Sequence, residues 1–288
     1  MPKLNGQPGT VSKILWHFTG GPKWNSSTDR QETRRKPAPD AYKAFTSILR
    51  AKELRVGGYA ELARVIIKER HRYDRSTGQK IIEKDVPVVV RSAPVCCLAD
   101  IPIAHLRYHE NRYGRFAIGF HRDAAVRHSF NPVLYTLEHT NLIRSIYDGL
   151  AELESIDCAS PAFAAMDISN YSGDCEHDDI EDLKSSAFQI EGYMDDIDES
   201  VKASRKRFAK IVAFVKTFTE KEFTSIYCER EWRSLDAFKF TRDDLAMLIL
   251  PHRIGKVTYY GDFIRDQIRR LKLPRRIPVV PWEDLIEH

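Results

Sequence analysis

The alternation of apolar and polar residues changes its period several times along the chain. After Asp40, apolar residues recur at helical spacing until Gly57-Gly58, which predicts a helix capped by Asp40. Similar spacing predicts further helices over residues 59–71, 102–113, 123–128, 201–218 and 261–271. Short runs of β-branched and aromatic residues predict strands over residues 11–20, 86–98, 115–120, 132–137, 224–234, 246–250 and 277–280.

Polar segments separate these predicted elements. Residues 23–39 are basic and contain two prolines, which predicts a mobile loop, and residues 72–86 predict a polar hairpin or loop. Residues 138–220 have the pattern of a helical insertion, in which the acidic segment 174–199 precedes a basic helix. Because strands gather at both ends of a helical middle, we expect an α+β fold, a single domain over 1–288 with the insertion 138–220.

Composition narrows the class of protein. The chain has 288 residues, a net charge of +4 and 42% hydrophobic residues, which are the values of a folded protein with a sizeable core. No apolar run is long enough to cross a bilayer, and the N-terminus has no apolar core of a secretory signal. The five cysteines include no CxxC pair, so we expect neither a disulfide framework nor a zinc site, and a cytoplasmic location.

The most informative short pattern is the pair Glu229 and Glu231. In a strand, residues two apart point to the same face, so the two carboxylates are predicted to lie side by side. Like charges at that distance repel, and such a pair indicates a chemical role or a bound cation. The alternative is a solvated edge strand on which Arg230 and Arg233 neutralise the two acids.

A second candidate lies at the end of the first predicted strand. Alternation places His17 and Thr19 on one face, next to glycines that allow a ligand to approach the backbone. A lone histidine satisfied by a neighbour is the structural alternative. His105 and His109 share a helical face, but no third metal ligand is evident, so no metal site is predicted.

The order of these motifs resembles the ADP-ribosyltransferase superfamily, with a His-Phe-Thr-Gly strand near the N-terminus and a late Glu-x-Glu strand. A closer resemblance is to the AbiGi family of abortive phage-infection proteins, which is labelled the antitoxin half of a two-gene defence system. The matching pieces are His17-Phe18-Thr19, Ala99-Asp100-Ile101-Pro102, His109 with Tyr113-Gly114, Ile118-Gly119-Phe120, Pro132-Val133-Leu134-Tyr135 and Glu229-Arg230-Glu231-Trp232-Arg233.

The first resemblance implies an ADP-ribosyltransferase-like mixed sheet and NAD as substrate. Glu231 would be the catalytic acid, because a carboxylate beneath the ribose stabilises an oxocarbenium ion, and Glu229 would accept the proton of the acceptor. His17 would contact NAD. The remaining expected NAD-binding residues are Thr19, Tyr59 as the aromatic that stacks on nicotinamide, Tyr113, and Arg115 at the pyrophosphate, a place that Arg230 or Arg233 could also fill.

The leading hypothesis is therefore NAD-dependent ADP-ribosyl transfer, or NAD hydrolysis, in anti-phage abortive infection, with a protein or nucleic-acid acceptor. The rival is a non-enzymatic antitoxin or sensor that binds a cognate partner protein. A third hypothesis is nucleic-acid binding through the basic segments Lys23–Lys36 and Arg265–Arg276.

Overall fold

The computed structural model describes residues 12–25, 27–28, 30–57, 60–73, 79–137, 140–155, 199–222, 229–273 and 276–285. The chain divides into two compact units. The first comprises Met1–Ala60, Pro94–Leu137 and Ala213–His288, and the second comprises Glu61–Ala93 and Glu138–Val212. The fold is mixed α+β, as expected, whereas the ADP-ribosyltransferase-like arrangement of the sheet stays a prediction.

A seven-stranded mixed sheet forms the centre of the first unit. Its strands follow the order β17 (Val279–Pro281), β14 (Leu245–Leu250), β8 (Ala117–His121), β1 (Ile14–Phe18), β7 (Cys96–Ala99), β12 (Glu231–Ser234) and β9 (Asn131–Pro132). Neighbouring strands pair antiparallel, except that β14 and β17 are parallel. The strands with the first and the last predicted site residues, β1 and β12, therefore lie on either side of β7.

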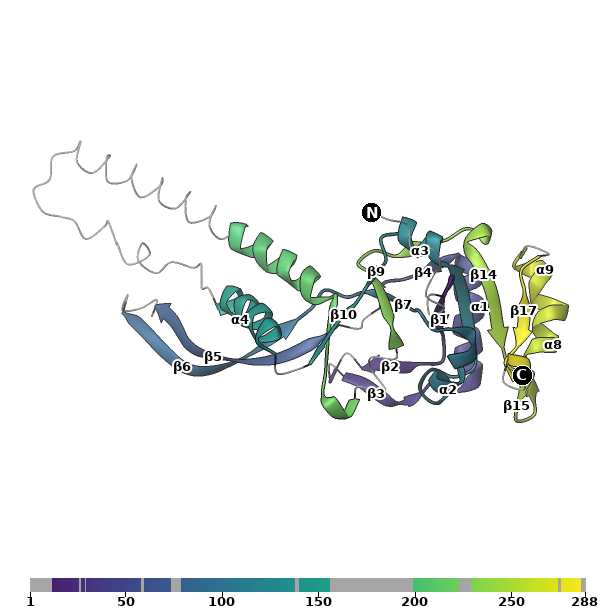
Figure 1. Ribbon diagram of the computed structural model, residues 1–288, viewed down its shortest axis with the longest axis horizontal. Helices are drawn as coiled ribbons and strands as arrows, with labels where there is room; N and C mark the ends of the chain where they lie inside the picture. Colours follow the sequence, from purple (N-terminus) through teal and green to yellow (C-terminus); the bar gives the residue numbers. More distant parts are fainter. Residues whose placement is uncertain are drawn as a thin grey trace, which may run out of the picture. The chain divides into compact units, whose positions relative to one another are not determined.

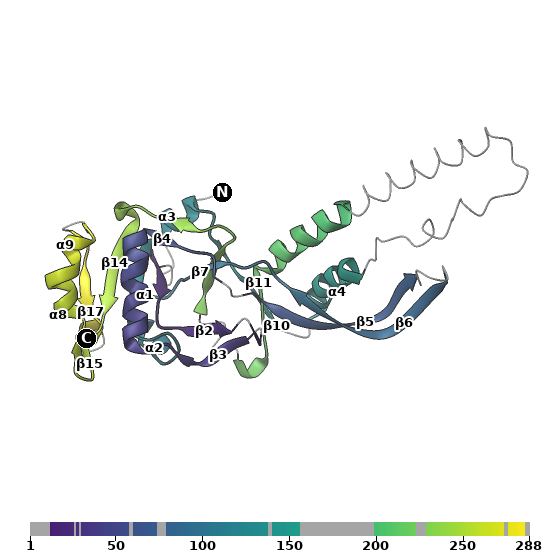
Figure 2. The same cartoon turned by 180° about the vertical axis from the view of Figure 1, so that it is seen from behind.

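Helix α1 (Ala38–Ala51) covers the sheet of the first unit (Figures 1 and 2). It begins after Pro37, and it ends at Lys52, whose φ of 54° is left-handed. Its buried Phe45 and Leu49 belong to the same core cluster as sheet residues such as Leu15, Ile118, Phe120 and Leu248. The helix predicted after Asp40 is confirmed, although Asp40 lies inside its first turn instead of capping it.

The register between β1 and β8 depends on a glycine. Gly119 pairs with Trp16, and a Cβ at Gly119 would lie 2.7 Å from the indole ring of Trp16. The indole Nε1 donates a hydrogen bond of 2.9 Å to the carbonyl of Ile101. The buried Trp16 thus fixes β1, and the next residue on that strand, His17, points to the other face.

Smaller elements complete the first unit. Helices α2 (Arg107–Tyr113) and α3 (Arg122–Arg127) flank β8, and β10 (Leu134–Leu137) pairs in parallel with β11 (Val215–Phe218). The predicted loop 23–39 is wrong, because β2 (Pro22–Asn25) and β3 (Arg30–Arg35) form an antiparallel hairpin followed by the start of α1. Before β14, the short strands β4 (Glu53–Leu54) and β13 (Phe238–Lys239) pair antiparallel. After β14 come the hairpin of β15 (Arg253–Ile254) and β16 (Val257–Thr258) and the helical turns α8 (Tyr260–Asp262) and α9 (Ile268–Arg270).

The second unit is built on a long hairpin of β5 (Leu62–Tyr73) and β6 (Lys80–Arg91), beside which α4 (Asn141–Ser155) packs (Figure 1). The helix predicted over 59–71 is wrong. The run Val65-Ile66-Ile67 pairs with Val86, Pro87 and Val88, so a long-range partner decides the conformation. A helix over 199–212 ends before β11, whereas the sequence pattern had extended it to residue 218.

Candidate functional site

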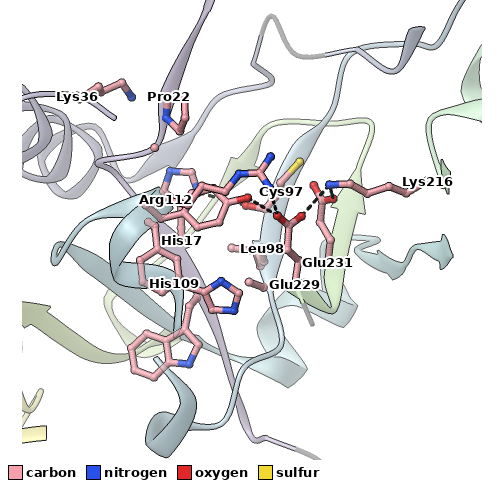
Figure 3. Close-up of a pocket in the computed structure, with 15 residues that line it drawn as sticks. His17, Pro22, Lys36, Cys97, Leu98, His109, Arg112, Lys216, Glu229 and Glu231 are labelled. Carbon is pink, nitrogen blue, oxygen red and sulfur yellow. Dashed lines mark hydrogen bonds and ion pairs between the residues drawn. The ribbon is translucent and has the colours of Figure 1, made fainter. Parts of the chain in front are cut away.

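A cavity of about 250 Å³ opens in the first unit, where β1, β7, α2, β11 and the start of β12 meet. Figure 3 shows its lining side chains, among them His17, Arg112, Glu229 and Glu231. Pockets that take drug-sized ligands usually have roughly 300–1,000 Å³. The cavity is therefore large enough for one ring-sized group rather than for a dinucleotide as a whole.

One lysine holds the two glutamates together. Nζ of Lys216 donates to Glu229 Oε2 at 2.7 Å and to Glu231 Oε2 at 3.1 Å (Figure 3). Lys216 and Glu229 are both buried, at 8% and 5% exposure. Because a lysine between two carboxylates cancels most of their repulsion, the pair is stable without any external cation.

The second oxygen of Glu229 is also occupied. Tyr113 donates its hydroxyl to Oε1 at 2.8 Å, and the guanidinium of Arg112 lies 2.9 Å from the same atom. Burial and the charge of Glu229 raise the pKa of Tyr113 well above its ordinary value, so the phenol stays protonated and remains a donor.

Glu231 has a second cation of its own. The guanidinium of Arg233, which is fully buried, donates from Nη2 to Glu231 Oε2 at 2.8 Å and from Nη1 to the carbonyl of Ala213. Burial alone would raise the pKa of Glu231, but the charges of Lys216 and Arg233 outweigh burial and hold this pKa well below its usual range. The carboxylate therefore stays ionised at any physiological pH.

Strand alternation does not explain why the two glutamates lie side by side at the cavity. Strand β12 begins at Glu231, and Arg230 before it has a left-handed φ of 42°, so Glu229 lies outside the strand. Arg230 points away and binds Asp100 Oδ2 at 3.1 Å, beside Arg122 at 3.3 Å. The expected neutralisation by arginine thus holds for Arg233 and not for Arg230.

His17 lines the cavity from β1. Its Nδ1 lies 3.2 Å from the carbonyl oxygen of Cys97. Burial and the nearby charge of Lys36 lower the pKa of His17 to about 4, although the hydrogen bond to Cys97 opposes this shift. The imidazole is therefore neutral at pH 7, and because a carbonyl only accepts, its proton lies on Nδ1.

Of the other residues expected to bind NAD, only some lie at the cavity. Tyr113 lines the cavity with His17. Thr19 is buried and donates to the carbonyl of Ala41 instead. Arg115 lies at a different cleft, where it pairs with Glu110 and Glu283, and Tyr59 lies outside the described residues.

Sequence reasoning missed the two cations that define the site, Lys216 and Arg112. Lys216 is the single charge in the apolar run of residues 211–218, and a lysine in that position signals a buried partner. Arg112 stands one residue before Tyr113 on α2 and gives no comparable signal.

Two further groups near the cavity do not add chemistry of their own. Cys97 lines it, but burial and the charge of Glu231 raise the pKa of this thiol well above its ordinary value, which disfavours a thiolate. His109 is packed against the rings of Phe18 and Tyr113.

Among the described residues, no group of three or more His, Cys, Asp or Glu could hold a metal ion. In the same part of the chain, no helix has the length and hydrophobicity to cross a membrane.

The arrangement binds charge more readily than it transfers protons. A general base needs a pKa near the working pH, whereas Glu231 is strongly stabilised as an anion by two cations. Glu229 is committed to Lys216, Arg112 and Tyr113. NAD as the ligand of this cavity stays a prediction.

Comparison with known proteins supplies the family. A family model described as "Putative abortive phage resistance protein AbiGi, antitoxin" matches residues 60–272, nearly three quarters of the chain. Neither the curated proteins nor the solved structures include a match.

This match corrects the leading hypothesis of the sequence. NAD-dependent ADP-ribosyl transfer is wrong as the function of the chain, because the family is described as an antitoxin, and the rival antitoxin hypothesis fits that description better. The expected connection with abortive infection and antiviral defence is confirmed. The chain belongs to the AbiGi family of abortive phage resistance proteins.

Proposed function

We propose that this protein is the antitoxin of a two-gene phage-resistance system, and that it silences its cognate toxin by binding it. The observation that carries the proposal is the family match over residues 60–272, whose description includes the word antitoxin. Binding needs a surface but no catalytic group.

The cavity supports a structural use of its charges. Both carboxylates are satisfied from within the chain by Lys216, Arg112 and Arg233, at distances of 2.7–3.1 Å. A buried network of this kind, with each acid paired, stabilises one arrangement of the surrounding strands. A non-catalytic protein that presents a fixed surface to a partner requires such rigidity.

The hairpin of β5 and β6 offers a surface for that partner. Ile66 is 64% exposed and Val89 is 60% exposed, and the register Ile66–Pro87 places these residues and Pro87 on one face. Val90, on the opposite face, is fully buried. The same register pairs Val89 with Arg64, so this face combines exposed apolar residues with a basic one, as the apolar centre and polar rim of a protein–protein interface do. A two-stranded hairpin also gains stability when its second face is covered. The hairpin lies within the matched residues.

The test is co-expression with the protein encoded by the adjacent gene of the system. We expect the two proteins to co-purify and growth to recover when both are made. Substituting Val89→Glu places a charge at the centre of the exposed face, and it should weaken the complex by at least about 30-fold, the effect of an interface hot spot.

A matched control uses an equally exposed valine in the first unit. Val126, on α3, is 55% exposed, so Val126→Glu introduces the same charge elsewhere. This variant should neutralise the toxin as well as the wild type. If the wild-type protein leaves the toxin fully active and forms no complex with it, the antitoxin proposal fails. If both variants retain full affinity, the hairpin is not the contact surface.

A further inference from the structure

A second hollow in the first unit, the basic cleft, has a charge quite different from that of the cavity. It measures about 830 Å³ and lies between the hairpin β2–β3, the start of α1, the residues around Arg115 and the turn of β15–β16. Among the described residues, six cations and one anion, Glu32, line it; the cations are Lys23, Arg34, Arg35, Lys36, Arg115 and Arg253.

Some of these cations already have counterions in the chain. Lys23 lies 3.7 Å from Asp40, and Arg115 pairs with Glu110 and Glu283. Arg35 donates to a backbone carbonyl, that of Glu110. Arg34 and Arg253 are exposed, and neither forms an ion pair with any of the described residues.

The cations of the basic cleft also act on one another. Burial and the charge of Lys23 lower the pKa of Lys36, and Asp40 offsets only part of this effect. Neighbouring cations that repel one another in this way are stabilised when an anion enters between them.

We propose that the basic cleft binds the phosphate backbone of a nucleic acid. The guanidinium fork of arginine suits phosphate oxygens, and four of the six lining cations are arginines. The cleft is near the upper end of the usual pocket sizes of roughly 300–1,000 Å³, so it has room for more than one phosphate.

An acidic polypeptide is a weaker candidate for the same cleft. Protein partners are anchored chiefly by apolar and aromatic side chains in pockets. Among the described lining residues, Ile254 is the one large apolar side chain that is exposed, at 37%, whereas Phe116 is buried at 1%. Contacts to a charged backbone need no such anchors.

In the chain's other basic segment, 265–276, Arg269 and Arg270 are exposed and form no ion pair with any of the described residues, but one arginine is neutralised within the chain. Arg265 is paired with Asp262 at 2.7 Å and with Asp266 at 3.1 Å. The structure therefore favours residues 23–36 as the part of the nucleic-acid hypothesis to test. In the segment 265–276, Arg265 is already neutralised within the chain.

The experiment measures fluorescence anisotropy of labelled mixed-sequence DNA, about 16 nucleotides long, the upper site size of a single-strand groove. Single-stranded and duplex forms are titrated with the full chain at several salt concentrations between roughly 50 and 200 mM. We expect binding whose affinity falls steeply with salt.

The cleft variant is Arg34→Gln with Arg253→Gln. If each arginine neutralises one phosphate, the log–log salt slope should fall by about 1.8 on duplex DNA and about 1.4 on single strands, and the affinity by roughly 10- to 100-fold near 0.1 M salt. The control is Arg269→Gln with Arg270→Gln, which removes the same charge from two exposed arginines on α9 and should change affinity less than about threefold.

Each other outcome overturns the proposal. Absence of binding at the lowest salt excludes a nucleic-acid site, and an equal loss in both double variants shows attraction to net charge alone. Polyglutamate that binds as tightly as DNA, and weakens equally in the cleft variant, identifies an acidic polypeptide as the partner. Full displacement of DNA by equimolar inorganic pyrophosphate identifies a small-anion pocket. Near-ultraviolet circular dichroism of both variants checks that they fold.

Discussion

The cavity and the basic cleft use similar side chains to opposite effect. In the cavity, Lys216, Arg112 and Arg233 lie within 3.1 Å of the carboxylates of Glu229 and Glu231, so the charges cancel inside the protein. In the basic cleft, the described lining residues include six cations and one anion, and Arg34 and Arg253 among these cations form no ion pair with any of the described residues. Two sites of the same unit thus use charge differently. Paired charges in the cavity stabilise the fold, whereas unpaired charges in the basic cleft are available to a partner.

Of the changes considered, Lys216→Met should lower the stability of the protein most. The change keeps the length of the side chain but leaves two buried carboxylates with less counter-charge, which should lower the free energy of unfolding by about 3–5 kcal/mol. Urea unfolding at neutral pH measures the loss. Adding Glu229→Gln should restore part of it, and a loss below about 1 kcal/mol would mean that the lysine is not the shared counterion.

The lowered pKa of His17 should make stability depend on pH. This change in stability is smaller and also reports on the cavity. The pKa of His17 is about 4 in the folded chain and 6.5 in its ordinary state, so folding favours the neutral ring. This contribution is complete above pH 6.5 and is lost as the pH falls from 6.5 toward 4. Between about pH 7.5 and 5 the loss should reach about 2 kcal/mol in urea unfolding.

The variant His17→Gln serves as the reference for this pH dependence. It removes the titrating ring, so its stability should change less than that of the wild type over the same interval. Identical pH profiles for the two proteins would place the ring of His17 in solvent and contradict its burial beside Cys97.

The smallest effect on stability is expected in the basic cleft. Arg34 and Arg253 are exposed and unpaired by any of the described residues, so replacing both by glutamine should change the free energy of unfolding by less than about 0.5 kcal/mol. Urea unfolding of this double variant, measured beside the Lys216 variant, tests the division directly. A cost above 1 kcal/mol would assign these arginines to the fold and not to a ligand.

The site was partly predictable because its residues carry local signals. A histidine at a strand end and two acids two residues apart are visible in the sequence, and the structure brings His17, Glu229 and Glu231 into one cavity. The role of Lys216 was not visible, since nothing near residue 216 shows that β11 approaches residues 229–231. Sequence patterns thus identified the two anions and one of their cations, Arg233, whereas long-range packing identified Lys216 and Arg112.

The fold shows the same limit. Short apolar runs correctly predicted β8 and β14, which are buried strands of the central sheet. The hairpin β2–β3 was missed, and β5 was predicted as a helix although the second half of β6 was predicted as a strand, because pairing across each hairpin decides its structure.

The left-handed backbone of Arg230 determines which mutations residues 229–231 tolerate. Its φ of 42° turns the chain between Glu229 and the start of β12, so one residue separates two acids that meet the same lysine. A substitution at position 230 keeps that spacing, and glycine would adopt the same backbone at little conformational cost while removing the ion pair with Asp100. An insertion or deletion of one residue would instead rotate one glutamate out of reach of Lys216. At this point of the molecule, the number of residues is constrained more tightly than their identity.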